Sequence, residues 1–179
     1  RQIVMSWDSA RLNDNSVIVI AEFYKKVVID SESGKKRDLG WHMKILNVVS
    51  LVDVKTKHRT PMRFPEQVEK FKELLLEYNG TQHGKLDYEN IKQVICDAGA
   101  GGQMIGSVAD YMLSNWTDKY GVQHKGIIDK SHKANESAIN SYPDALDIMS
   151  LVDPRAHRNE IFESIEKMIK LGVVSFPAD

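Results

Sequence analysis

The stretch IKQVICDAGAGGQ, at residues 91–103, decides the fold that we expect. Its apolar run 94–96 ends on the carboxylate of Asp97. A tight turn follows, and its glycines are Gly99, Gly101 and Gly102. Residues 104–116 then repeat apolar side chains at helical spacing. Because open α/β sheets keep their sites at the carboxyl ends of the strands, this order of strand, acid, turn and helix predicts that Asp97 lies at such an edge.

The composition is that of an ordinary globular protein. The chain has 179 residues, 42% of them hydrophobic and 27% charged, so we expect one domain over residues 1–179. The formal net charge of −1 excludes an overall basic field, although a local basic patch could still contact nucleic acid. The single cysteine, Cys96, excludes a disulfide within the chain and fits a reducing compartment. No apolar stretch is long enough to span a bilayer, so no membrane partner is expected.

Three strands are predicted before the first helix. Residues 2–8 alternate in polarity, and Asp8 ends this strand. One of its faces carries Ile3, Met5 and Trp7. Turn residues then lead into a nearly continuous apolar run that begins at Val17 and breaks at 30–40, and a third strand follows over 41–54. The lengths predict an antiparallel meander whose last two strands form a long ribbon.

A helix is predicted over residues 65–78. Its apolar stripe consists of Val68, Phe71, Leu75 and Tyr78. This helix connects the third strand to the strand that ends at Asp97, and such a crossover can return the chain to lie parallel beside the first strand. Asp8 and Asp97 would then lie side by side at one edge of a mixed α/β sheet.

The pattern is less regular after the glycine turn. Residues 122–129 predict a strand that ends at Asp129, and residues 131–142 predict a polar loop. Asp153, followed by proline, is typical of a helix start. The helix is expected to turn inward the side chains of Ile161, Ile165, Met168 and Ile169. Residues 173–176 predict a short last strand.

Three parts of the chain resemble the nuclease domain of large terminase subunits from tailed bacteriophages. Residues 3–8, with the turn and long apolar strand after them, are similar to the first acidic motif of that family, and residues 94–102 are similar to the second. The stretches 142–145, 153–155 and 174–177 are similar to the region that precedes the third acidic motif. The resemblance implies a ribonuclease H-like fold, in which a three-stranded meander and then parallel strands form a mixed sheet flanked by helices.

The same resemblance implies a metal-dependent endonuclease that cuts double-stranded phage DNA during genome packaging, in the cytoplasm of the infected bacterial host. Asp8 and Asp97 would be its catalytic acids and would hold two Mg²⁺ or Mn²⁺ ions. The family carries a third acid on a C-terminal helix, so we expect that ligand beyond Asp179, in a larger packaging protein of which this chain is a C-terminal fragment. Within the chain, Asp129 is the best-placed substitute. The implied partners are the ATPase domain of the same polypeptide, the small terminase subunit and the portal.

The residue types suit this chemistry, but each also has a structural interpretation. Two carboxylates at adjacent strand ends can bridge hard divalent cations, which is the interpretation that we favour, whereas Asp97 alone could also end a strand or cap a helix. The glycines of the 99–102 turn could let a phosphate backbone approach, or could form a plain tight turn. Five basic residues could contact DNA phosphates or simply be solvated: Lys35, Lys36 and Arg37 at the hairpin, and Lys130 and Lys133 after the Asp129 strand.

Other functions remain open at this stage. The sequence from Asp97 to Gly101 loosely resembles the glycine-rich motif of S-adenosylmethionine-dependent methyltransferases, and Asp129 could then bind a ribose. That fold does not explain the preceding meander. An ATPase is disfavoured because no Gly-Lys-Ser/Thr follows the glycines. A domain that binds DNA or other motor parts without cutting is the remaining alternative.

Overall fold

The computed structural model describes residues 2–8, 16–53, 60–79, 88–98 and 112–177. Its centre is a seven-stranded sheet in the order β4-β3-β2-β1-β5-β8, with β9 paired to β3 outside this path. The strands are β1 (Gln2–Asp8), β2 (Ser16–Ile29), β3 (Lys36–Asp53), β4 (Thr60–Pro61), β5 (Ile91–Asp97), β8 (Met149–Val152) and β9 (Val174–Ser175). The helices are α1 (Phe64–Asn79), α3 (Glu136–Ser141) and α4 (Arg158–Lys170), together with the 3-10 turn η1 (Lys133–Asn135).

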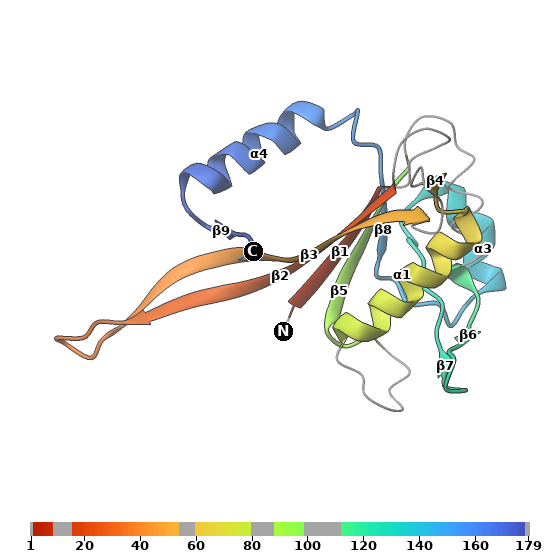
Figure 1. The fold of residues 1–179 in the computed structure, drawn as a ribbon, viewed down its shortest axis with the longest axis horizontal. Helices are drawn as coiled ribbons and strands as arrows, with labels where there is room; N and C mark the ends of the chain where they lie inside the picture. The colour runs from red at the N-terminus through yellow and green to blue at the C-terminus, as the bar shows by residue number, and fades with distance from the viewer. Residues whose placement is uncertain (1, 9–15, 54–59, 80–87, 99–111, 178–179) are drawn as a thin grey trace.

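The strand directions confirm the expected mixed sheet. β1, β2 and β3 form an antiparallel meander. β5 then lies parallel to β1, and β8 lies parallel to β5. The chain passes from β3 to β5 through α1, so the predicted crossover does bring the Asp97 strand beside the first strand (Figure 1). None of the described helices is long and apolar enough to cross a membrane.

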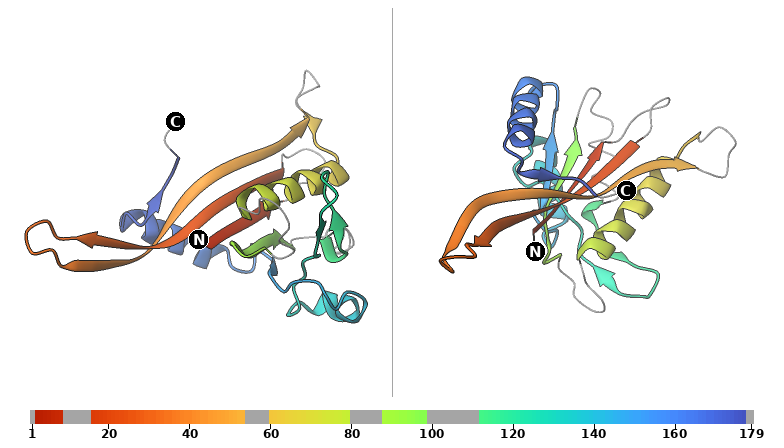
Figure 2. Two further views of the ribbon diagram at one scale, coloured as in Figure 1. Left: turned by 90° about the horizontal axis from the view of Figure 1, so that it is seen from below. Right: turned by 60° about the vertical axis from the view of Figure 1, so that its left-hand side comes forward.

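The core lies between the sheet and α1. Trp7 of β1 is stacked between two rings of that helix, with centroids 5.8 Å from Phe64 and 5.1 Å from Phe71. Phe71 is 0% exposed, and Val68 and Leu75 of the predicted stripe are also buried. We call this side of the sheet the α1 face and the opposite side the α4 face, because α1 and α4 lie on opposite sides of the sheet (Figure 2). Burial of alternate residues on β1 follows from this one-sided packing.

The far halves of β2 and β3 leave the sheet as a two-stranded arm (Figure 1). The pairing continues to Ile29 and Lys36, so β3 begins five residues before the predicted start at 41. Asp30 closes the tip, where its carboxylate accepts hydrogen bonds from the backbone N–H and hydroxyl of Ser33. The apolar side chains of the arm are exposed and include Val27, Val28, Ile29 and Trp41.

Several predictions for the second half of the chain are wrong. Within 122–129 the only strand is the two-residue β7 (Gln123–His124), which pairs with β6 (Trp116–Thr117), and Ile127 forms an isolated bridge to Leu146. The predicted loop at 131–142 contains η1 and α3, held by the Asn135 side-chain amide, which donates to the carbonyl of Asp129 at 2.8 Å. β8 was not anticipated, because its four residues show no distinct pattern.

The last helix also differs from the prediction. It begins at Arg158, since Asp153 accepts a hydrogen bond from the Arg155 backbone N–H and closes a turn there. Its apolar stripe does not face inward, and Ile165 is 47% exposed. Helical spacing specifies that a helix has an apolar side, but it does not supply the surface that covers it. The short last strand is confirmed as β9.

Candidate functional site

Asp8 and Asp97 end two neighbouring parallel strands. Trp7 pairs with Cys96, so the two acids, which we call the acid pair, occupy the next position on β1 and β5. Since side chains alternate along a strand and both Trp7 and Cys96 face α1, both carboxylates belong to the α4 face. Asp8 is exposed and Asp97 is partly buried. The structure therefore brings together the two residues that the sequence singled out.

Packing on the α1 face fixes the position of the acid pair. A slip of one residue in either strand would turn its acid toward the core and bring Trp7 or Cys96 out of it. The ladder also continues past Asp97, because the backbone N–H of Ala98 donates to the carbonyl of Val152 at 2.7 Å. The strand end is thus held from both sides, by β1 and by β8.

Cys96 does not belong to the site chemically. Its thiol is buried, and burial raises its pKa to about 12, with the nearby charge of Asp97 adding to the shift. A thiol with so high a pKa is protonated at neutral pH, and it is the thiolate that binds metals and attacks electrophiles. Cys96 acts as a small core residue that orients its neighbour.

Asp129, the expected substitute ligand, has a different role in the structure. One carboxylate oxygen accepts the backbone N–H and hydroxyl of Ser131, at 3.0 and 2.6 Å, and the backbone N–H of His132 at 3.0 Å. The other accepts the backbone N–H of Leu151 at 2.8 Å. Burial alone would raise the pKa of Asp129, but these hydrogen bonds outweigh it and hold the pKa below its ordinary value.

The position of Asp129 also separates it from the acid pair. Its segment follows the edge of β8 that faces away from β5, as the hydrogen bond from the Met149 backbone N–H to the carbonyl of Ile128 shows. β8 therefore lies between Asp129 and Asp97, which places them about 10 Å apart at ordinary strand spacing. That distance is too long for both to bind one ion directly, and Asp129 is a buried hub that joins the 129–132 turn to β8.

Other acids near this edge are also engaged with backbone groups. Asp147 accepts the backbone N–H of Lys130 at 2.9 Å, and Asp153 accepts that of Arg155 at 3.0 Å. Among the residues that the structure describes, no group of three or more His, Cys, Asp or Glu side chains could hold a metal ion. Within those same residues, the acid pair is the arrangement that best suits a hard cation.

The basic residues that were predicted to contact DNA fall into two separate places. Lys130 and Lys133 are exposed and follow Asp129, on the far side of β8 from the acid pair. The backbone N–H of Lys130 donates to Asp147, which precedes β8, whereas Asp97 pairs with Val152, the last residue of β8. Lys36 pairs with Ile29 at the tip of the arm, twelve residues along β2 from Val17, the partner of Asp8. At strand rise this is up to about 40 Å, so the tip cannot contact the phosphate that the acid pair would contact. The glycines Gly99, Gly101 and Gly102 lie outside the described residues.

A polar cluster that sequence reasoning missed joins α1 to the β6–β7 hairpin. His124 contacts the carboxylate of Asp118 at 3.0 Å, and both side chains are buried. The ring of Trp116 packs on His124 at 4.7 Å between centroids, and its indole N–H donates to the Tyr88 hydroxyl at 3.0 Å. The hydrogen bond from His124 is the main reason that the pKa of Asp118 is lowered. The signal in the sequence was the alternation of Trp116, Asp118 and, after a turn, His124.

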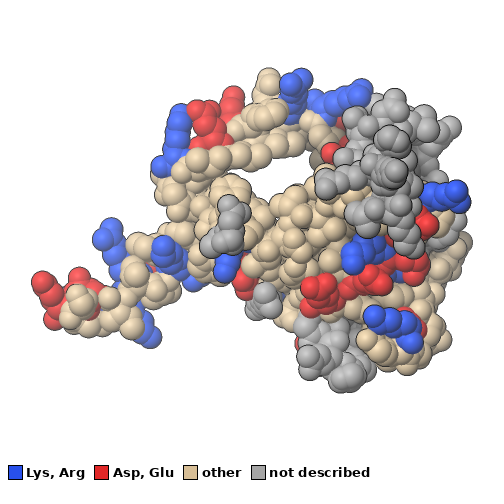
Figure 3. Space-filling view, in the orientation of Figure 1, with Lys and Arg blue, Asp and Glu red and all other residues tan. Residues whose placement is uncertain are grey.

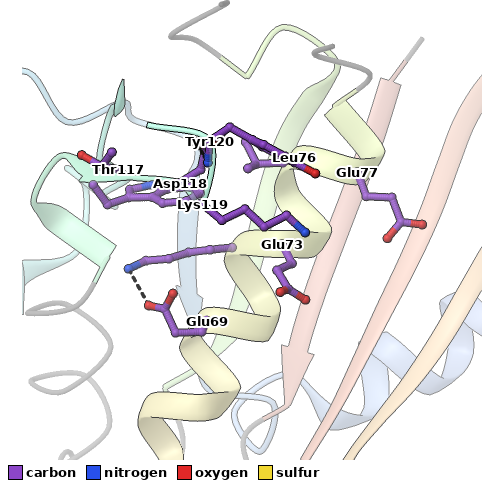
Figure 4. A pocket seen from close by; sticks show the side chains of 10 residues that line it. Glu69, Glu73, Leu76, Glu77, Thr117, Asp118, Lys119 and Tyr120 are labelled. Atoms are coloured by element: carbon purple, nitrogen blue, oxygen red, sulfur yellow. Dashed lines mark hydrogen bonds and ion pairs between the residues drawn. The ribbon is translucent and has the colours of Figure 1, made fainter. Parts of the chain in front are cut away.

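A cavity of about 620 Å³ lies between this hairpin and α1 (Figure 4). Charged side chains line it. Lys72 contacts Glu69, also in the lining, at 3.1 Å, and Glu73 contacts Lys70, which lies outside the lining, at 3.2 Å. The ammonium of Lys72 also lies 5.2 Å from the centre of the Trp116 ring. Since Glu69, Lys72 and Glu73 have ion-pair partners within the protein, we interpret this cavity as a joint between two elements.

Comparisons with known proteins identify no relative. No family model matches the chain, and searches of curated proteins and of solved structures found no significant match. The function must therefore be argued from the acid pair and its surroundings.

Proposed function

We propose that this chain is a metal-dependent endonuclease domain of the kind found in large terminase subunits, which cuts double-stranded DNA during phage genome packaging. The observation that carries the proposal is the acid pair: Asp8 and Asp97 end adjacent parallel strands and belong to the same face of the sheet. An acid on each of two central strands, beside an open face, is a geometry in which a cation and a DNA backbone can meet.

The donor set fits a hard divalent cation. Carboxylate oxygens are the ligands that Mg²⁺ and Mn²⁺ prefer, and both members of the acid pair supply them. Asp8 and Asp97 would hold such an ion. When bound, it would polarise the phosphodiester and lower the pKa of a water molecule. A second ion would need further oxygen ligands besides the acid pair.

The remaining residues would orient and position the substrate. Packing of Trp7 and Cys96 in the core holds both carboxylates on one face. Lys130 and Lys133, beyond the β8 edge of the sheet, would contact phosphates that flank the scissile bond. Contacts of this kind read no base edges, so cleavage should show little sequence preference. The basic tip of the arm would touch DNA about twelve base pairs away, because it lies up to about 40 Å from the acids.

The topology supports the choice of family, although it does not decide it. The meander β1–β2–β3, the α1 crossover and the parallel strands β5 and β8 follow the order that the resemblance implies. The methyltransferase alternative loses support, because both carboxylate oxygens of Asp129, its expected ribose ligand, accept hydrogen bonds from the protein.

A domain that binds DNA without cutting is the second candidate. One observation favours it: no third metal-ligating side chain joins the acid pair within the described part of the chain. Such a domain would still bind DNA through its basic residues, but its binding would not depend on a divalent cation.

Cleavage of supercoiled plasmid in Mg²⁺, in Mn²⁺ and in chelator tests the proposal. We expect slow nicking that requires the metal and drops at least a hundredfold in Asp8→Asn and in Asp97→Asn. Asp144→Asn is the matched control, because Asp144 is an exposed acid away from these strands. Equal cleavage by all variants would refute the assignment. DNA binding without any cleavage, unchanged by chelator, would favour the second candidate.

A further inference from the structure

Helix α4 carries an apolar stripe that is largely exposed in the described structure. Its members are Ile161, Phe162, Ile165, Met168 and Ile169. Phe162 is 62% exposed, and every residue of the helix except Met168 is exposed. The opposite side of the helix carries Glu163 and Lys167. Isolated helices shorter than about 12–15 residues are marginal in water, so a 13-residue helix of this pattern needs a packing surface.

The α4 face of the sheet is also apolar and open. Its exposed or partly buried members are Val4, Val17, Val19, Val48, Ile95 and Val152. Val48 is 59% exposed, whereas its neighbour Val49, on the α1 face, packs against the core. Figure 3 shows open space between α4 and the body of the protein. The helix thus leaves apolar side chains exposed on the same side of the sheet as exposed apolar side chains of the strands.

The connections show that α4 belongs on this face. β8 and β9 are both parallel to β1, since β8 is parallel to β5 and β9 to β3. β8–α4–β9 is thus a helical crossover within one sheet, and such helices pack on the face that they cross. The α1 crossover runs from β3 toward β5, and the α4 crossover runs back toward β3 on the other face. Opposite directions on opposite faces give both crossovers the same hand, as the rule for parallel strands requires.

The length of α4 matches the width of the sheet that it would cross. From β8 to β3 the sheet is four strand intervals wide, or about 19 Å. The 13 residues of α4 span about 20 Å, and short connections at 153–157 and 171–173 supply the rest of the diagonal path. Both ends of the helix are already anchored to the sheet, because β8 pairs with β5 and β9 pairs with β3.

We propose that α4 is a strap, tethered at β8 and β9, that closes onto the α4 face of the sheet and buries its apolar stripe against the valines there. The structure describes the open form. The hinge at 153–157 begins directly after Val152, the partner of Asp97, so closure brings the first turn of the helix over the edge that holds the acid pair. The strap would control access to this edge whatever ligand the acids bind.

Thiol labelling with a maleimide tests the closure. Three single-cysteine reporters are made in the full chain: Ile165→Cys on the stripe, Val48→Cys on the sheet, and Glu163→Cys on the opposite side of the helix as the control. Cys96 is buried and contributes little to the labelling. We expect the cysteines at 165 and 48 to react at least tenfold more slowly than the cysteine at 163. Equal rates at the three positions would overturn the proposal.

A second pair of measurements identifies what covers the sheet. Adding Ile161→Asp and Ile169→Asp to the Val48→Cys variant should speed its labelling at least fivefold if α4 is the cover. An unchanged labelling rate would overturn the proposal. Protection that increases with protein concentration would also overturn it, because a second copy of the chain would then be the cover.

Hydrogen exchange tests closure in the unmodified chain. The α4 amides should be protected at least tenfold, and exchange at the rate of an unfolded peptide would contradict closure.

Discussion

The two faces of the central sheet differ in how they are covered. On the α1 face, Trp7 is stacked between Phe64 and Phe71 in a continuous core. On the α4 face, valines and the acid pair share a surface with exposed side chains, and α4, a described helix on that side, stands away from it. The α1 face thus supplies stability, while the α4 face holds the groups that can meet a ligand. The predictions below test this division, beginning with the largest expected effect.

Truncation of Phe71 should be the most damaging change. Phe71→Ala removes a fully buried ring from the α1 face and should lower the free energy of unfolding by about 3–5 kcal/mol. Urea denaturation measures this. Phe162→Ala, the matched phenylalanine on α4, should cost much less. Equal losses would mean that α4 is as firmly packed as α1, and the distinction between the faces would fail.

Loss of the Asp129 carboxylate should have the second-largest effect on stability. Asp129→Ala leaves the backbone N–H groups of His132 and Leu151 without their acceptor, which should cost about 2 kcal/mol. Asp144→Ala, the removal of an exposed acid, should change the unfolding free energy by less than about 0.5 kcal/mol. If Asp129→Ala were as stable as the parent and lost metal affinity instead, Asp129 would be a ligand after all.

Closure of the strap should make a smaller contribution to stability. Ile165→Ala should lower the free energy of unfolding by about 1 kcal/mol. The loss is small because closure of α4 buries the stripe against one surface and leaves the rest of the helix in solvent. Glu163→Ala on the opposite side of the helix is the control for helix propensity. Denaturation curves that coincide for both variants would indicate that α4 does not close.

Acid should weaken the joint between α1 and the β6–β7 hairpin. The folded pKa of Asp118 lies below its unfolded value of about 3.9, so its contribution is present above pH 4 and is lost as the pH falls through the folded pKa. The melting temperature of the parent should therefore fall as the pH is lowered below 4. Asp118→Asn should flatten this part of the curve, and an equally steep fall in the variant would contradict the assignment.

Sequence reasoning worked where burial on one face creates a clear pattern. The alternation in residues 2–8 and the stripe of α1 follow from packing against a single core, and together with the crossover rule they placed Asp8 beside Asp97. It failed where local hydrogen bonds decide the structure. The turn at Asp129, the start of α4 and the β6–β7 hairpin depend on individual side chains such as Asn135, Asp153 and His124, which have no periodicity to detect.

The acid pair illustrates both outcomes. Its position could be predicted, because register and strand direction depend on the hydrophobic pattern. The structural role of Asp129 could not be predicted from the sequence. An acid at a strand end looks the same in sequence whether it faces solvent or accepts four hydrogen bonds, as Asp129 does.

Calorimetric titration of the chain with Mn²⁺ tests the central claim most directly. The account predicts one weak site, because two carboxylates and water hold a single hard cation loosely. Binding should disappear in Asp8→Asn and in Asp97→Asn and persist in Asp144→Asn, with all three variants as well folded as the parent by circular dichroism. Mn²⁺ binding that survives the loss of either member of the acid pair would contradict the claim that these two carboxylates form the site.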